Sequence, residues 1–111
     1  MKIVSVKEAV VVDNPHMVDS RKLYDHESAQ AVHITLPPGT GLKPHITPVD
    51  VFFYILEGSP TVLVGDERVV VQHDSLVESP KDIVHSLYNE TGEVARILVV
   101  KAPKPVAPTK F

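Results

Sequence analysis

The chain has 111 residues and a mass of 12.2 kDa, enough for one folded domain and too little for two folded lobes in one subunit. Hydrophobic residues make up 43% of the sequence and charged residues 23%, which is typical of a globular protein and argues against wholesale disorder. The net charge of -3 excludes no small ligand, but it makes nucleic acid a poor partner, because no excess of positive charge would attract a polyphosphate.

The cysteine and histidine counts limit the chemistry further. Without cysteine, disulfides cannot support the fold, and any metal must be bound by nitrogen and oxygen atoms. No secretory hydrophobic segment opens the sequence and no apolar run is long enough to span a bilayer, so we expect a cytoplasmic protein without membrane contact. The six histidines are His16, His26, His33, His45, His73 and His85.

Short β-like runs separated by turn signals fill the chain. Valine is the commonest residue, at 20 of 111, and β-branched residues favour strands. Gly and Pro clusters punctuate the runs, and nothing between them is long enough for a crossover helix, so the strands should be mostly antiparallel. The pattern predicts an all-β sandwich or small closed barrel. The expected strands are Ile3–Val6, Ala9–Val12, Ala29–Leu36, Val49–Leu56, Thr61–Val64, Arg68–Gln72, Ser75–Glu78, Val84–Tyr88 and Val94–Lys101.

The two ends of the chain differ from this pattern. The stretch Val12–Leu23 is polar and has no strand periodicity, which predicts a long loop or an arm. Residues 103–111 contain three prolines and predict an extended tail rather than a strand. We therefore expect one domain over residues 1–102, which includes an N-terminal strand and arm region at 1–28, followed by the Pro-rich tail.

Two motifs resemble the cupin superfamily. Gly39–Gly58, GTGLKPHITPVDVFFYILEG, is similar to the first cupin motif, with Gly39, His45 and the closing Gly58 at the expected spacing. Pro80–Asn89, PKDIVHSLYN, is similar to the second, with Pro80, His85 and Asn89 matching and Asp82 in place of a glycine. The resemblance covers roughly residues 29 to 103 and implies a small antiparallel β-barrel, a double-stranded jelly roll with a pocket at one mouth.

The resemblance also implies a metal site, from which this sequence departs. In metal-binding cupins three histidines and one glutamate hold a divalent transition ion. Here the second histidine position is Thr47 and the glutamate position is Val51, so His45 and His85 remain as candidate ligands. Two imidazoles make a weak site, because such ions usually take at least three protein ligands. We expect weak or non-standard binding of iron, manganese, nickel or zinc.

Three further side chains are open candidates. Strand alternation puts Asp50 on the face opposite to Thr47, unless a bulge near Pro48 reverses it. His33 lies on the polar face of its strand, where it could line a sheet surface or a subunit contact. Glu78 could act as a general base if it points inward, although strand carboxylates are more often on the wet face. Solvated positions are the default for His16, His26 and His73.

Three functions from different classes fit these residues. The favoured one is a small polar ligand held in the barrel mouth, at a candidate site formed by His45, Thr47, His85, Leu87 and Asn89. The alternative is a metal-dependent small-cupin enzyme of the isomerase or dioxygenase type. The third is a non-catalytic dimeric scaffold. A homodimer is expected in any case, because Ile46, Phe52, Tyr54 and Leu56 form a second apolar face on the motif 1 strand that needs burial.

Overall fold

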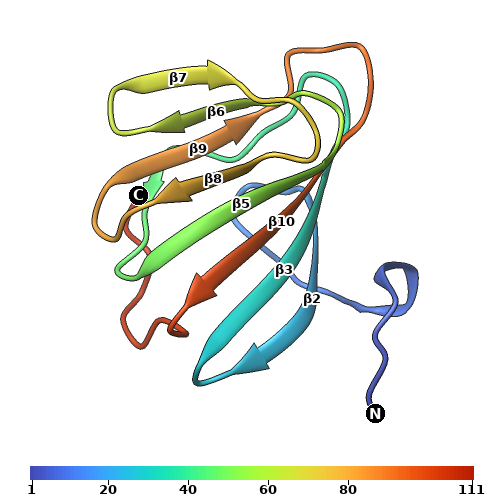
Figure 1. Cartoon of the computed structure of the whole chain (residues 1–111), viewed down its shortest axis with the longest axis vertical. Coiled ribbons are helices and arrows are strands. Elements are labelled where there is room, and N and C mark those ends of the chain that lie inside the picture. The colour runs from blue at the N-terminus through green and yellow to red at the C-terminus, as the bar shows by residue number, and fades with distance from the viewer.

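All strand pairings in the computed structural model, which describes residues 1–111, are antiparallel, and they form two sheets (Figure 1). The larger sheet has the order β1 (Val10–Val11), β2 (Asp19–His26), β3 (Ala29–Leu36), β10 (Ala95–Ala102), β5 (Asp50–Glu57) and β8 (Leu76–Ser79). The smaller sheet has the order β4 (His45–Ile46), β9 (Val84–Tyr88), β6 (Thr61–Val64) and β7 (Glu67–Val70). The predicted all-β double-stranded jelly roll is confirmed.

The core lies between the two sheets because apolar side chains alternate along the central strands. On β5 the inward positions are Val51, Phe53 and Ile55, all buried, while the residues between them are only half-buried. The neighbouring strand β10 shows the same alternation from Ala95 to Val99. This period of two is what a strand with one face on the core requires. Eleven buried hydrophobic residues make one cluster, to which the smaller sheet adds Val62 and Leu87.

The motif 1 strand is broken at Pro48, which differs from the single strand that the sequence suggests. His45 and Ile46 form β4 in the smaller sheet, and Asp50 begins β5 in the larger one. Proline has no N–H to continue a ladder, so the chain changes sheets at this point. Ile46 therefore does not share the outer face of β5 with Phe52, as the sequence analysis expected.

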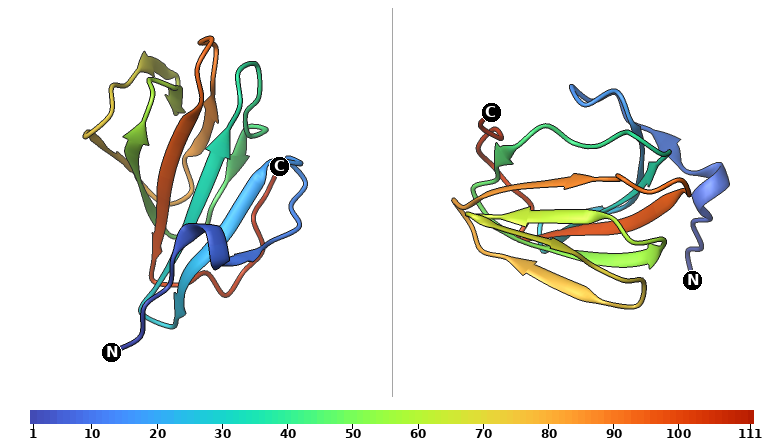
Figure 2. Two further views of the ribbon diagram at one scale, coloured as in Figure 1. Left: turned by 90° about the vertical axis from the view of Figure 1, so that its right-hand side faces the viewer. Right: turned by 90° about the horizontal axis from the view of Figure 1, so that it is seen from above.

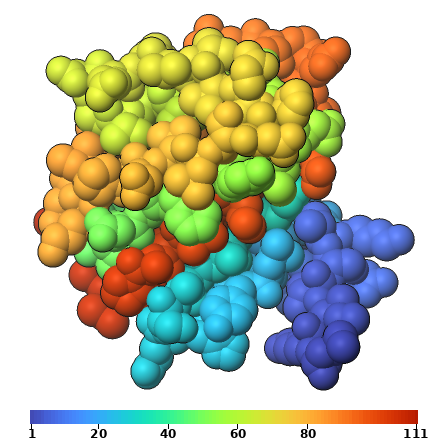
Figure 3. All heavy atoms as spheres, viewed as in Figure 1, coloured from blue at the N-terminus to red at the C-terminus, as the bar shows by residue number.

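The N-terminal region differs from the expected strand pattern as well. The segment Ile3–Val6 is not a strand, and a single 3₁₀ turn, η1 (Val6–Glu8), follows it. Figure 3 shows these first residues projecting from the body of the molecule. Conversely, the polar stretch after Val12 contains the start of β2, whose inward positions include Ser20 and Lys22. Polar inward residues explain why no apolar alternation marked this strand.

The Pro-rich tail returns to the body and pairs with it. The backbone N–H of Lys110 donates to the Ile46 carbonyl at 2.9 Å, and the Ile46 N–H donates to the Lys110 carbonyl at 2.6 Å. Closer to β10, the Lys104 ammonium lies 2.8 Å from the Asp25 carboxylate. In Figure 2 the C-terminal end lies beside β4. Lys110 in the tail thus forms an antiparallel β-bridge with Ile46 at the edge of β4.

Positive φ angles mark the turns that hold the motifs. Gly58 has φ of 79°, and a Cβ atom there would approach the Val94 carbonyl oxygen to 2.7 Å, so only glycine fits. Asp82, at the position where the second cupin motif has glycine, has φ of 64°, and Asp74 has φ of 61°. Both aspartates thus keep a left-handed conformation that favours glycine.

Candidate functional site

A cavity of about 390 Å³ lies between the larger sheet and the edge formed by β4 and β9. Its walls come from β2, β3, β5 and β10, with the loop before β2 and the tail completing them. Nine of the 19 lining residues are hydrophobic, and polar side chains from several elements converge on the cavity beside them, a mixture that suits a small-molecule site. The apolar wall includes Val32, Ile34, Leu42, Val51, Phe53 and Val99.

The two motif histidines lie side by side at this cavity. Residues His45 and His85 are direct partners in the β4–β9 ladder, and both are buried. Their Nε2 atoms are 3.1 Å apart, and the two rings meet edge to face. The spacing in two distant motifs therefore locates two side chains that the fold brings into contact.

Hydrogen bonds to neighbouring groups determine the protons on these rings. The Lys43 carbonyl can only accept, so His45 Nδ1–H donates to it at 2.6 Å, and Nε2 of neutral His45 is an acceptor. His85 Nε2–H then donates to His45, which leaves His85 Nδ1 to accept from the Ser79 hydroxyl at 2.7 Å. The Thr47 hydroxyl lies 3.2 Å from His85 Nε2 as a second partner. A chain of hydrogen bonds thus fixes both imidazoles.

Burial keeps these histidines neutral at neutral pH. Desolvation, followed by the charges of His45 and Lys101, lowers the pKa of His85 to about 4. Desolvation also lowers the pKa of His45, although its bond to the Lys43 carbonyl opposes this shift. Neutral imidazoles can accept a proton or a hydrogen bond, so the pair presents hydrogen-bonding groups without charge to the cavity.

The remaining predicted site residues lie around this pair rather than in the cavity. Thr47 is buried beside His85, outside the cavity lining. Leu87 is fully buried in the hydrophobic core. Asn89 donates from Nδ2 to the carbonyls of Leu36 and Glu93, and its Oδ1 accepts from Thr91. The structure therefore brings His45, Thr47 and His85 together, while Leu87 packs the core and Asn89 holds a turn.

The open candidates all lie outside the cavity. Asp50 is exposed, and its carboxylate accepts from the Lys81 N–H at 2.9 Å. Glu78 is exposed on β8, so it does not point inward as a base for this site. His33 is buried on the other face of the larger sheet, where Arg96 donates to its Nε2 at 3.1 Å.

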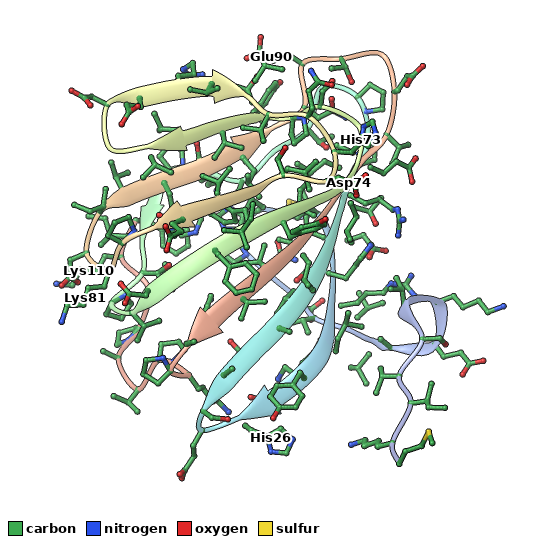
Figure 4. All side chains as sticks on the ribbon, viewed as in Figure 1. His26, His73, Asp74, Lys81, Glu90 and Lys110 are labelled. Carbon is green, nitrogen blue, oxygen red and sulfur yellow. The ribbon has the colours of Figure 1, made fainter.

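The other histidines separate into two groups. Figure 4 shows His26 at the tip of the β2–β3 hairpin and His73 at the opposite end of the molecule, both away from the cavity. His16, in contrast, lines the cavity, with its ring centroid 5.0 Å from that of His45, which corrects the solvated position expected for it. Burial and the charges of His45 and nearby lysines lower the pKa of His16 to about 4.

Two cavity residues that were not predicted from the sequence, Lys101 and Phe111, lie close to the histidines. Lys101 lies on β10 in the inward register that begins with Ala95, and it lines the cavity beside the histidines. Alternation along Val94–Lys101 could have indicated this lysine, because it shares a face with Ile97 and Val99. Phe111 in the tail packs against His16 and His45, with ring centroids 5.5 and 5.7 Å apart, and no local pattern marks that contact.

The donor set does not complete a transition-metal site of the usual kind. The two Nε2 atoms are spaced as neighbouring ligands of one ion would be, and Thr47 adds only a neutral hydroxyl. Val51, at the family's glutamate position, is an apolar part of the cavity wall. No group of three or more His, Cys, Asp or Glu side chains is placed to hold an ion. The residues present therefore fit a divalent transition metal poorly.

The jelly roll and its paired motif histidines define a cupin-type β-barrel. A model of the cupin domain matches residues 32–101, and this chain belongs to that family. No curated protein matches the sequence. No helix is long and apolar enough to cross a membrane.

Solved structures share the whole fold. TT1209 from Thermus thermophilus is 29% identical with a TM-score of 0.81, over 95% of this chain and 100% of that chain. The polyketide cyclase RemF from Streptomyces resistomycificus is 22% identical with a TM-score of 0.85, over 99% of this chain and 84% of that chain. A predicted oxalate decarboxylase from Thermotoga maritima is 19% identical with a TM-score of 0.83, over 93% and 100%. The last two likenesses concern the fold alone.

Proposed function

We propose that this cupin binds a small organic molecule in the cavity between its sheets, with His45 and His85 as the polar contacts. The proposal depends on one observation: two neutral, hydrogen-bonded imidazoles lie next to apolar side chains in a cavity of about 390 Å³. A volume of this order holds a compact ligand, and a few converging polar groups orient it. Thr47 acts by holding His85 in place.

The alternative is a metal-dependent enzyme of the isomerase or dioxygenase type. The 3.1 Å separation of the two Nε2 atoms favours it, since both lone pairs could turn to one divalent ion. Its weakness is the hydroxyl and the isopropyl group at the other two ligand positions, Thr47 and Val51. Binding of an organic molecule without a metal does not require the two missing ligands, so it remains the preferred proposal.

The proposal is tested by nuclear magnetic resonance of the ¹⁵N-labelled protein against a panel of small carboxylic acids, alcohols and sugars. At least one class should shift the signals of His45 and His85 and of the cavity wall. Val32→Phe, which fills the cavity, should abolish these shifts. Val64→Phe is the matched control, because Val64 is also half-buried against the core but does not line the cavity. Absence of binding across the panel, or binding insensitive to Val32→Phe, would contradict the proposal.

We also propose that the chain forms a homodimer through the outer face of the larger sheet. The residues Phe52 and Tyr54 on β5 pair with Val100 and Leu98 on β10, and their side chains point away from the core. All four are half-buried within a single chain. A second copy would remove this continuous apolar surface from water.

A further inference from the structure

The cavity walls carry positive charge and no negative charge. Among the 19 residues that line the cavity there is no aspartate or glutamate, but there are two lysines, Lys22 and Lys101. The protein as a whole has a net charge of -3, so this composition does not follow from an excess of basic residues. The charged side chains of the cavity are therefore opposite in sign to the net charge of the whole chain.

Lys101 has no partner for its charge within the chain. It occupies an inward position on the central strand β10, between Gln30 on β3 and Val51 on β5. None of the four salt bridges and none of the side-chain hydrogen bonds includes its ammonium group, although burial is sufficient to lower its pKa. An unpaired cation that loses water costs free energy, and a bound anion would offset that cost.

Lys22 differs from Lys101 in this respect. Its ammonium lies 3.2 Å from the Asp25 carboxylate, which also pairs with Lys104 outside the cavity. Lys22 thus has an anionic partner, which it shares with Lys104, whereas Lys101 has none and is the cation available to a ligand.

The rest of the wall limits the kind of anion. The side chains of Ile34, Phe53 and Val99 can pack against the hydrocarbon part of a ligand, but they cannot form hydrogen bonds. Lys101 is the lining lysine without a partner, so the cavity matches a single negative charge better than the charge of about −1.5 to −2 that a phosphate group carries at pH 7. A neutral sugar would leave the charge of Lys101 without a partner.

We propose that the ligand of this cavity is a small carboxylic acid, held with its carboxylate on Lys101 and its hydrocarbon body against the apolar wall. This inference rests on the proposed function and adds the chemical class of the ligand. Beside Lys101, the His85 Nε2–H can donate to the carboxylate in exchange for its bond to His45 Nε2.

The test compares hexanoate with hexanamide, two probes of almost the same shape that differ in charge. Binding is measured by titration calorimetry and by shifts of cavity signals in the ¹⁵N-labelled protein. The wild-type chain should prefer hexanoate by about 10- to 100-fold, the range of a hydrogen bond to a charged group. Lys101→Met should remove this preference, because both probes then meet an uncharged wall. Lys104→Met removes a lysine that does not line the cavity, and it should retain the preference.

Lys101→Arg provides a second variant in case the methionine chain folds poorly, and it should keep a preference for the acid. Equal affinity for the two probes, or a preference that survives Lys101→Met, would overturn the carboxylate inference and leave the cavity as a neutral ligand site. If neither probe binds, the inference is also overturned, and the broad panel above then decides separately whether the cavity binds any small molecule.

Discussion

The Ser79 hydroxyl holds the His85 ring from the side opposite to His45, with Oγ 2.7 Å from Nδ1. Both residues are buried, and they come from different sheets, β8 and β9. This hydroxyl supplies the only hydrogen bond to Nδ1, and by donating it supports the tautomer that the Lys43 carbonyl fixes through His45. A residue outside the cavity thus helps to hold the ring that lines it.

Ser79→Ala should lower the free energy of unfolding by about 1–3 kcal/mol, because a buried imidazole nitrogen loses its donor. Urea denaturation measures the loss, and ¹⁵N chemical shifts of the ring report the tautomer. Ser86→Ala is the control, since Ser86 is buried on the same strand as His85 but makes no side-chain hydrogen bond. The His85 tautomer should stay the same, since the bond from Nε2–H to His45 remains, and equal losses in the two variants would contradict the role given to Ser79.

Metal content tests the alternative function. Purified, untagged protein from cells supplied with iron, nickel, manganese and zinc should contain less than one ion per chain, because two imidazoles meet at their Nε2 atoms while His16 Nδ1 already accepts from the Lys43 N–H. Elemental analysis of this protein and of the His45→Ala, His85→Ala double variant measures it. A stoichiometric ion that the double variant loses would instead favour the metal-dependent enzyme.

Restoring the family ligands should raise metal affinity by orders of magnitude. Thr47 lies next to His85 Nε2, and Val51 lines the same cavity, so Thr47→His with Val51→Glu would add two donors near the existing pair. Competition with a chromophoric chelator measures the affinity, and each single variant should give a smaller gain. An unchanged affinity in the double variant would show that these positions do not face the histidines.

Acid should destabilise the fold before carboxylates titrate. The folded-state pKa values of His16 and His85 are lowered from 6.5 to about 4 by burial, so below pH 6.5 the unfolded chain takes up protons that the folded chain refuses. Stability contributed by these neutral rings is present above pH 6.5 and is lost as the pH falls towards about 4. Melting temperatures between those limits should fall, and His16→Gln should flatten the decline. Substitution of His26, exposed at a hairpin tip, should not.

Asp82→Gly should stabilise the protein by about 1 kcal/mol, because a non-glycine residue at φ of 64° is strained. The neighbouring hydrogen bond from the Asp82 N–H to the Thr47 carbonyl, at 3.0 Å, is kept by glycine. Thermal denaturation measures the gain. Asp82→Ala should destabilise the protein. If Asp82→Ala were more stable than Asp82→Gly, the change in stability would come from the side chain rather than from backbone strain.

Sedimentation at micromolar concentration should show a dimer. Leu98→Glu on the outer face of the larger sheet should dissociate it, because a charge would have to be buried without a partner. Val69→Glu, on the exposed strand β7 of the other sheet, is the control and should remain dimeric. A wild-type monomer would dispose of the proposed interface.

The sequence predicts the barrel and the position of its histidine pair better than the rest of the site. Motif spacing places His45 and His85, since two short segments fix both residues relative to their turns. His16 and Phe111 reach the cavity only after distant ends of the chain fold back onto it, which no local pattern encodes. The inward position of Lys101 could have been predicted from the period of two along its strand. A lysine at the end of a strand, however, is usually assigned to solvent. Asn89 matches the motif and yet holds a turn, and Leu87, which lies between the two motif residues, packs the core.

The three phenylalanines of the chain lie in three different environments. Phe52 is on the outer face of the larger sheet, Phe53 is in the cavity wall, and Phe111 is in the returning tail against His45. Biosynthetic incorporation of fluorophenylalanine would therefore give three ¹⁹F resonances with separate meanings. One labelled sample would report subunit association, cavity occupancy and the position of the tail at the same time.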